Sequence, residues 1–275
     1  MIGTPILLEP APDYTSTIHD LYRDGIVAFR GCFSPSWADQ LRTDFDRLFA
    51  EARRIDGGTV SRGTNRYYFA VHPERLRGFA ELITSPAVHG LSTQLLGEGY
   101  RIIEVGFDVP LPGALNQPWH RDFPMPDETR YDRRLSSLAF NLTTVDVDPD
   151  MGPFEVAPGT HWDDDSDFAH GMFPADVRRY EALGSRRCPK QGDMSVRTGL
   201  TVHRGTANNS AKARAVLVLG VVAADVPTDV HEIEVTADYY AGMPALARRH
   251  LDCRVVPELR PIVQQHTIEG LVMGV

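Results

Sequence analysis

The chain has 275 residues, of which 42% are hydrophobic and 24% charged, the ordinary balance of a soluble globular protein with its own core. Its 28 Lys and Arg against 37 Asp and Glu give a net charge of -9, so the surface lacks the basic field to which nucleic-acid backbones bind. No stretch approaches the roughly 18 apolar residues of a membrane span, and the start has no basic region of a secretory signal. These features predict a cytoplasmic protein without nucleic-acid or membrane partners, in which the three cysteines stay reduced.

Residues 1–99 are predicted to be mainly helical. The clearest helix begins at Ser34-Pro35, because serine caps helices and proline suits the first turn. Apolar residues then recur at three- and four-residue steps and share one face: Trp37, Leu41, Phe45, Leu48 and Phe49. A second helix is predicted over residues 85–97, and a shorter one around residues 18–23. Each is expected to pack one face against another layer.

From residue 100 the pattern changes to short β-rich runs separated by turn residues. These runs cover residues 101–109, 135–145, 152–157, 200–205 and 213–223. The segment 215–222 is apolar at nearly every position, which indicates a strand covered on both faces, as in a two-layer sandwich or closed roll. No helix alternates regularly with these strands, and there is no glycine-rich nucleotide-binding motif, which argues against a doubly wound sheet. Helix returns after residue 225, and no repeat or linker divides the chain, which favours one domain.

Two segments carry residues suited to a metal. His120 and Asp122 form an H-x-D pattern, and in an extended segment positions i and i+2 project from the same face. An imidazole nitrogen and a carboxylate oxygen could then meet one cation. His203 is a third candidate, and the turn formers around Asn208 predict a hairpin that places Arg214 directly opposite His203.

Two histidines and one carboxylate on a β scaffold are the ligand set of non-haem Fe(II) oxygenases, although zinc uses the same ligands. Arg214 favours the oxygenase, because a guanidinium binds a carboxylate through two hydrogen bonds. The spacing suits the far carboxylate of a five-carbon dicarboxylate whose 2-oxo acid end chelates the iron.

The order of these residues resembles the phytanoyl-CoA dioxygenase-like family of Fe(II)/2-oxoglutarate oxygenases. The resemblance rests on His120-x-Asp122, Gly152-Pro153 leading into the Pro158-Gly159-Thr160-His161 turn, and His203 followed by Arg214 eleven residues later; the segment Asp24 to Ser34 is also similar. It implies a mainly β fold with flanking helices around a double-stranded β-helix, a jelly-roll or cupin-like core. It further implies a single domain over residues 1–275, with a helical brace (1–99), a jelly-roll core (100–225) and a C-terminal lid or helical segment (226–275).

The resemblance also assigns roles to individual residues. His120, Asp122 and His203 match the iron ligands, and Arg214 matches the arginine that holds 2-oxoglutarate. Three further residues are candidate contacts to this cosubstrate: Gln117, Asn141 and Arg66. Because relatives that chlorinate their substrates lack the carboxylate ligand, the presence of Asp122 predicts hydroxylation or a related oxidation.

The predicted activity is therefore a dioxygenase that uses Fe(II), 2-oxoglutarate and O2 to hydroxylate or otherwise oxidise a small organic molecule in specialised metabolism, releasing succinate and CO2. Candidate pocket walls are Phe123 and Met125, together with Tyr239-Tyr240 on the C-terminal lid. Two alternatives remain at this point: a zinc-dependent hydrolase or isomerase on a cupin-like fold, and a catalytically silent jelly-roll binding protein. The sequence identifies neither the substrate nor the oligomeric state.

Overall fold

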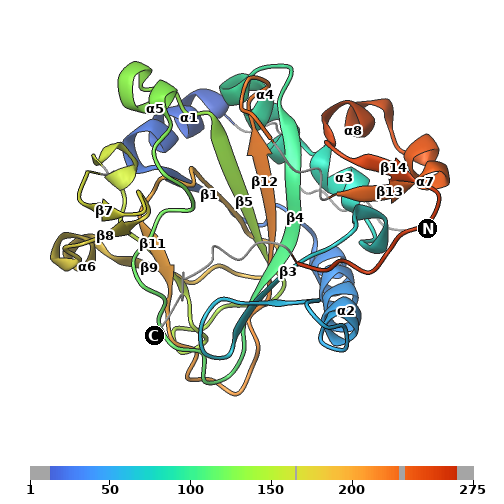
Figure 1. Ribbon diagram of the computed structural model, residues 1–275, viewed down its shortest axis with the longest axis horizontal. Helices are drawn as coiled ribbons and strands as arrows, with labels where there is room; N and C mark the ends of the chain where they lie inside the picture. The colour runs from blue at the N-terminus through green and yellow to red at the C-terminus, as the bar shows by residue number, and fades with distance from the viewer. Residues whose placement is uncertain (1–12, 165, 229–232, 265–275) are drawn as a thin grey trace.

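The computed structural model describes residues 13–164, 166–228 and 233–264, drawn in colour in Figure 1. Its α-helices are α1 Tyr14–Asp24, α2 Pro35–Ala52, α3 Phe79–Ile83, α4 Leu91–Leu96, α5 Asp127–Asp132, α6 Arg178–Leu183, α7 Ala237–Gly242 and α8 Ala245–His250. Short helical turns of other types are η1 Pro73–Arg75, η2 Pro86–Gly90 and η3 Thr160–Trp162. No helix in these described ranges is long and apolar enough to cross a membrane.

The strands form two larger sheets and two small ribbons. They are β1 Ile26–Phe29, β2 Val60–Ser61, β3 Arg66–Ala70, β4 Arg101–Pro110, β5 Ser137–Thr143, β6 Phe154–Val156, β7 Phe168–Ala169, β8 Phe173–Pro174, β9 Ser185–Arg187, β10 Met194–Arg197, β11 His203–Gly205, β12 Val216–Val222, β13 Glu234–Thr236 and β14 Arg254–Val256. The major sheet has the order β1-β10-β5-β12-β4-β3-β2, and the minor sheet has the order β11-β6-β9.

The two sheets form a double-stranded β-helix, which confirms the predicted fold class. The segment at His120 bridges antiparallel to His203 and so extends the minor sheet beside β11. Along the chain, β4, the His120 segment, β5, β6, β9, β10, β11 and β12 then wind between the two sheets. Three strands, β1, β2 and β3, come from the part of the chain predicted to be mainly helical and widen the major sheet at its two edges.

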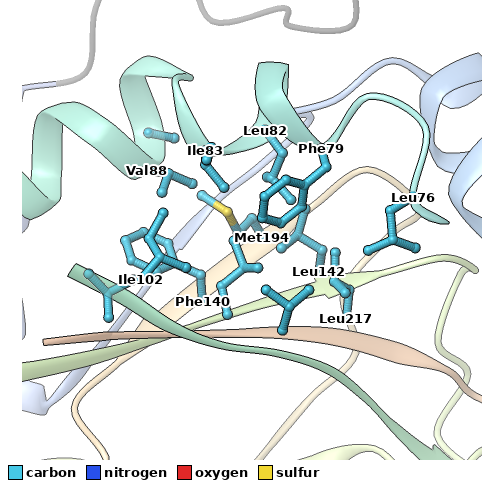
Figure 2. Close-up of a cluster of buried hydrophobic side chains, with 14 of the residues drawn as sticks. Leu76, Phe79, Leu82, Ile83, Val88, Ile102, Phe140, Leu142, Met194 and Leu217 are labelled. Carbon is cyan, nitrogen blue, oxygen red and sulfur yellow. The ribbon is translucent and has the colours of Figure 1, made fainter. Parts of the chain in front are cut away.

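One face of the major sheet packs against the helices and makes the main core. Figure 2 shows Leu82 and Val88 of the helical layer meeting Phe140, Met194 and Leu217 of the strands. Because side chains alternate along a strand, the residues between these positions point into the roll. The outer face of the minor sheet carries a smaller cluster of Trp119, Ala157, Phe168, Tyr180 and Val202.

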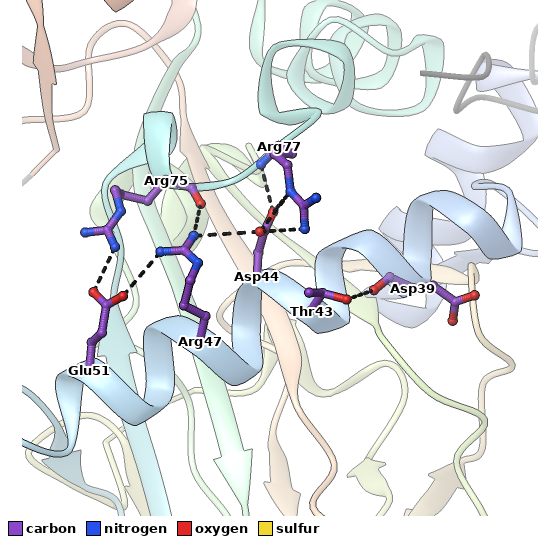
Figure 3. A network of polar contacts seen from close by, with 7 residues as sticks. All are labelled: Asp39, Thr43, Asp44, Arg47, Glu51, Arg75 and Arg77. Carbon is purple, nitrogen blue, oxygen red and sulfur yellow. Dashed lines mark hydrogen bonds and ion pairs between the residues drawn. The ribbon is translucent and has the colours of Figure 1, made fainter. Parts of the chain in front are cut away.

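Two helix ends lie where the sequence signals predict them, whereas α1 begins earlier than predicted, at Tyr14, and α2 ends at Ala52. Ser34 caps α2 by accepting a hydrogen bond from the Trp37 amide, and Gly25 ends α1 in the left-handed conformation with φ of 73°. Figure 3 shows a polar network that attaches α2 to the segment after η1, centred on Asp44.

The predicted hairpin between His203 and Arg214 is wrong. β11 pairs with β6 in the minor sheet, whereas β12 pairs with β4 and β5 in the major sheet. The turn residues between them cross from one sheet to the other. Asn208 is buried there, and its side-chain amide donates to the carbonyls of Pro110 and Lys212.

The predicted pocket role of Tyr239 and Tyr240 stays a prediction. Both lie on α7, are partly buried and pack against the main core. The rest of the predicted C-terminal lid lies partly outside the described residues, at 229–232 and 265–275.

Candidate active site inside the roll

The structure brings His120, Asp122 and His203 together at one end of the roll. One potential ligand atom from each residue lies within 4.8 Å of the others. The His203 Nε2 is 3.4 Å from the Asp122 Oδ1, and the two imidazole rings have their centroids 4.4 Å apart. His120 and His203 are 83 residues apart in the sequence. Two backbone hydrogen bonds between them, each 2.9 Å long, hold them side by side. These three side chains form the arrangement expected of a metal site.

Backbone carbonyls orient both imidazoles. The Nδ1 of His120 is 2.8 Å from the Pro118 carbonyl, and the Nδ1 of His203 is 2.8 Å from the Thr201 carbonyl. An Nδ1–H that donates to a carbonyl leaves the Nε2 lone pair available for a cation. Burial, followed by the neighbouring His203 ring, lowers the pKa of His120 to about 3, so the His120 ring is neutral and able to ligate at neutral pH. The donor set therefore fits a divalent cation.

Asp122 faces the two histidines with an ionised carboxylate. Burial acts to raise its pKa, but the charge of Arg197 and the contact with His203 outweigh this and hold the pKa well below its usual range. The backbone amide of Asp122 donates to the Gly199 carbonyl, and 34% of the Asp122 side chain remains accessible. The two imidazoles are buried, so the cluster is closed toward the sheet and open on the carboxylate side.

A second charged cluster lies deeper in the roll, where β4 ends and β12 begins. The guanidinium Nη1 of Arg66 is 3.2 Å from Asp108 Oδ2, and Nη2 of Arg214 is 3.6 Å from the same oxygen. Both arginines are buried, and burial lowers the pKa of Arg214 to about 10, against the attraction of Asp108. Two guanidinium cations thus share one carboxylate, which leaves excess positive charge inside the roll.

Arg66 connects this cluster to the histidines through β11. A Cβ at Gly205 would lie 2.4 Å from Arg66 Nη1, so the absence of a side chain at Gly205 makes room for the guanidinium. Gly205 lies two residues after His203 on β11, a separation of about 7 Å along a strand. A five-carbon dicarboxylate is of a comparable length.

The other predicted residues lie on the same inner surfaces, and their roles remain predictions. Gln117 accepts a hydrogen bond from the Gly205 amide through Oε1 at 3.0 Å. Asn141 lies on the inward-facing phase of β5, level with Ser195 and Val218 on the adjacent strands. Phe123 follows Asp122 directly and borders Gly199, where a Cβ would lie 2.5 Å from its ring. Met125 is buried nearby in sequence.

Two charged residues of the site were missed by the sequence reasoning, namely Arg197 and Asp108. Both occupy inward-facing positions of strands whose alternate residues are apolar core, Met194 and Val196 on β10 and Phe107 and Val109 on β4. A charged residue at a position that alternates with apolar core residues along a strand is the signal that could have identified Arg197 and Asp108.

Comparison with known sequences gives a family and a relative. A family model described as phytanoyl-CoA dioxygenase matches residues 21–216. An ectoine dioxygenase of Nocardia farcinica is 28% identical over 203 residues, 68% of this chain and 65% of that protein, so the match spans just under two thirds of the relative.

Among solved structures, a 2-oxoglutarate-dependent carbocyclase from nogalamycin biosynthesis, SnoK, has a TM-score of 0.60 at 20% identity, covering 81% of this chain and 88% of that one. HygX of Streptomyces hygroscopicus, solved with nickel and 2-oxoglutarate, has a TM-score of 0.57 at 15% identity, covering 81% and 92%. At these identities the structural likeness supports the fold alone.

Proposed function

The chain belongs to the phytanoyl-CoA dioxygenase family, and from this premise we propose that it is an Fe(II)- and 2-oxoglutarate-dependent oxygenase of a small organic molecule. It would consume 2-oxoglutarate and O2 and release succinate and CO2. The observation that carries the proposal is the convergence of His120, Asp122 and His203 inside the roll. Specialised metabolism is the context we propose, in keeping with the nogalamycin pathway named for one structural neighbour.

His120, Asp122 and His203 would each supply one ligand atom to the metal. His120 and His203 would ligate through Nε2, since each Nδ1 is held by a backbone carbonyl, and Asp122 would supply one carboxylate oxygen. Iron in such a facial triad supplies the oxidising chemistry and keeps positions open for other ligands. The protein provides ligation, orientation and a water-poor interior, and no side-chain acid or base is needed.

Arg214 and Arg66 would hold the far carboxylate of 2-oxoglutarate. Buried polar groups are nearly always paired, yet the Nε atoms of both arginines are buried without a hydrogen-bond partner. An incoming carboxylate would supply acceptors and neutralise the excess charge shared with Asp108. This proposal joins the predicted roles of Arg214 and Arg66 at one carboxylate.

Turnover of 2-oxoglutarate tests the proposal. Purified protein supplied with 2-oxoglutarate, Fe(II), ascorbate and O2 should release succinate and CO2 in equal amounts, faster with a substrate from a panel of small molecules. His203→Ala should abolish release because it removes a ligand. Absence of succinate from the native protein, together with hydrolysis by a zinc-loaded form, would establish the hydrolase alternative.

The presence of Asp122 further favours oxygenated products over halogenated ones. A carboxylate at this position occupies the place where a halide would bind the metal. Turnover in high chloride should therefore give products with added oxygen, a new double bond or a new ring. A chlorinated main product in the mass spectrum would show that Asp122 does not ligate the metal.

A further inference from the structure

Arg197 binds the side of Asp122 that faces away from the histidines. Its Nη1 lies 2.5 Å from Asp122 Oδ2, while Asp122 Oδ1 lies 3.4 Å from His203 Nε2. The two carboxylate oxygens therefore have different neighbours: one meets the histidines and the other meets a guanidinium. The pair joins residues 75 positions apart in the chain.

The sheet holds Arg197 in this place. On β10, Met194 and Val196 face the main core, so Arg197 faces into the roll, and its register partner on β5 is the small residue Ala139. The guanidinium lies 5.5 Å from the centroid of the Phe154 ring, and only 8% of the side chain is exposed. Burial of the Arg197 guanidinium costs free energy unless an anion lies beside it.

We propose that Arg197 is an anion-holding positioning residue. In the native protein the anion is the Asp122 carboxylate, which Arg197 keeps turned so that only Oδ1 points toward the metal. If the carboxylate is removed, the same guanidinium holds a small external anion, such as formate or chloride, in its place. This inference rests on the metal site of the proposed function and extends it to a residue with no assigned role.

The position of Arg197 explains both of these effects. Occupation of Oδ2 by a guanidinium prevents both oxygens from binding one metal, so more of the coordination sphere stays open for cosubstrate. Without Asp122, Arg197 would be a buried charge lacking its partner, and a small anion would relieve that cost. The space left by the Asp122 carboxylate would adjoin Gly199, because a Cβ built on Gly199 would lie only 3.0 Å from Asp122 Oδ2. This space therefore suits only a small anion.

Chemical rescue of metal binding tests the proposal. Cobalt(II) binding, followed by visible absorption and calorimetry, avoids any dependence on turnover. Asp122→Ala should bind cobalt at least about tenfold more weakly than the native protein. Formate should restore most of that loss in Asp122→Ala, and chloride should restore part of it.

A double variant identifies the residue responsible. Formate should give no rescue in Asp122→Ala combined with Arg197→Gln. The matched control combines Asp122→Ala with Arg204→Gln, because Arg204 pairs with Glu155 on the minor sheet and not with the site. This control should retain the rescue. Equal rescue with and without Arg197 would overturn the proposal, as would no rescue in any variant while the native protein binds cobalt.

Single variants with Asp122 intact provide a second test that does not require the alanine variant to fold. Arg197→Gln should weaken cobalt binding by about tenfold and change the visible spectrum, with Arg197→Lys in between. An unchanged affinity and spectrum in Arg197→Gln would overturn the proposal while leaving the metal site intact. Failure of the native protein to bind cobalt or iron would instead overturn the proposed function, and this inference with it.

Discussion

Two buried guanidinium groups, those of Arg66 and Arg214, share the partly exposed carboxylate of Asp108 inside the roll. Such a cluster costs free energy when it lacks a full set of partners. Binding of the proposed dicarboxylate cosubstrate would offset this cost, which would link its affinity to these three side chains.

Arg214→Ala should weaken 2-oxoglutarate binding strongly and leave metal binding nearly unchanged. The lost charge-assisted contact corresponds to about 2–4 kcal/mol in binding free energy. Arg214→Lys should recover only part of the affinity, because a lysine cannot form the bidentate pair. Calorimetric titration of the metal-loaded protein with 2-oxoglutarate measures this difference. An unchanged affinity in the alanine variant would show that Arg214 does not hold the cosubstrate.

His120 and Asp122 could be found from a local pattern in the sequence, whereas Arg197, which acts through a distant partner, could not. His120 and Asp122 are two positions apart, so strand alternation alone places them on one face. The contact between Asp122 and Arg197 depends on β10 lying beneath the loop after His120, which is a property of the whole roll. Nothing near Arg197 in the sequence specifies that partner.

Helix α2 is attached to the rest of the molecule by both apolar and ionic contacts. Its apolar face packs into the main core, while the buried Asp44 accepts hydrogen bonds from the Arg77 backbone amide at 2.9 Å and from the Arg77 Nε at 3.0 Å. Arg47 adds an ion pair to Asp44 at 3.7 Å, and Figure 3 shows these groups converging between α2 and the segment after η1.

Asp44→Ala should therefore lower the free energy of unfolding by about 2–4 kcal/mol, because it leaves the Arg77 amide and guanidinium without their acceptor. Asp46→Ala is the matched control on the same helix. Asp46 is exposed and pairs only with Arg42 among the described residues, so its loss should cost about 0.5 kcal/mol or less. Urea denaturation of the two variants measures both values, and equal losses would contradict this account of how α2 is attached.

Individual helix ends could be predicted from the sequence, whereas strand pairing could not. Ser34, Pro35 and Gly25 specify helix ends through local hydrogen bonds and backbone conformation, so their signals are contained in the sequence. The segment between His203 and Arg214 contains turn-forming residues. The same residue types occur in a hairpin turn within one sheet and in a connection between two sheets, so the sequence does not distinguish the two. Tertiary contacts such as those of Asn208 decide between them.

The whole molecule consists of a roll with one sheet covered by helices. The winding of strands between two sheets brings residues from β10, β11, β12 and the His120 segment to one interior, although they are spread over a hundred positions. The resemblance to a known family, and not the periodicity of the strands, predicted this winding. Composition and alternation alone specified only a sandwich or a closed roll.

The three cysteines differ in burial, so their reactivity toward a thiol reagent tests the packing of the molecule. Cys188 is exposed, whereas burial raises the pKa of Cys32 to about 12 and that of Cys253 to about 11. A thiol reacts through its thiolate, so the native protein should show one fast thiol at pH 8, with Cys253 slow and Cys32 reacting only on unfolding. A thiol-reactive dye followed by peptide mapping assigns each rate. Fast labelling of Cys32 would contradict the packing of β1 and α2 against the main core.

The visible absorption of the protein with Fe(II) and 2-oxoglutarate, measured in the absence of O2, tests whether iron and 2-oxoglutarate bind together at His120, Asp122 and His203. A 2-oxo acid that chelates iron through two oxygens gives a weak metal-to-ligand band. We expect this band for the native protein, its loss in His203→Ala, and its absence when glutarate, which lacks the 2-oxo group, replaces 2-oxoglutarate. A native protein that binds zinc tightly and shows no such band with iron would contradict the proposed iron site.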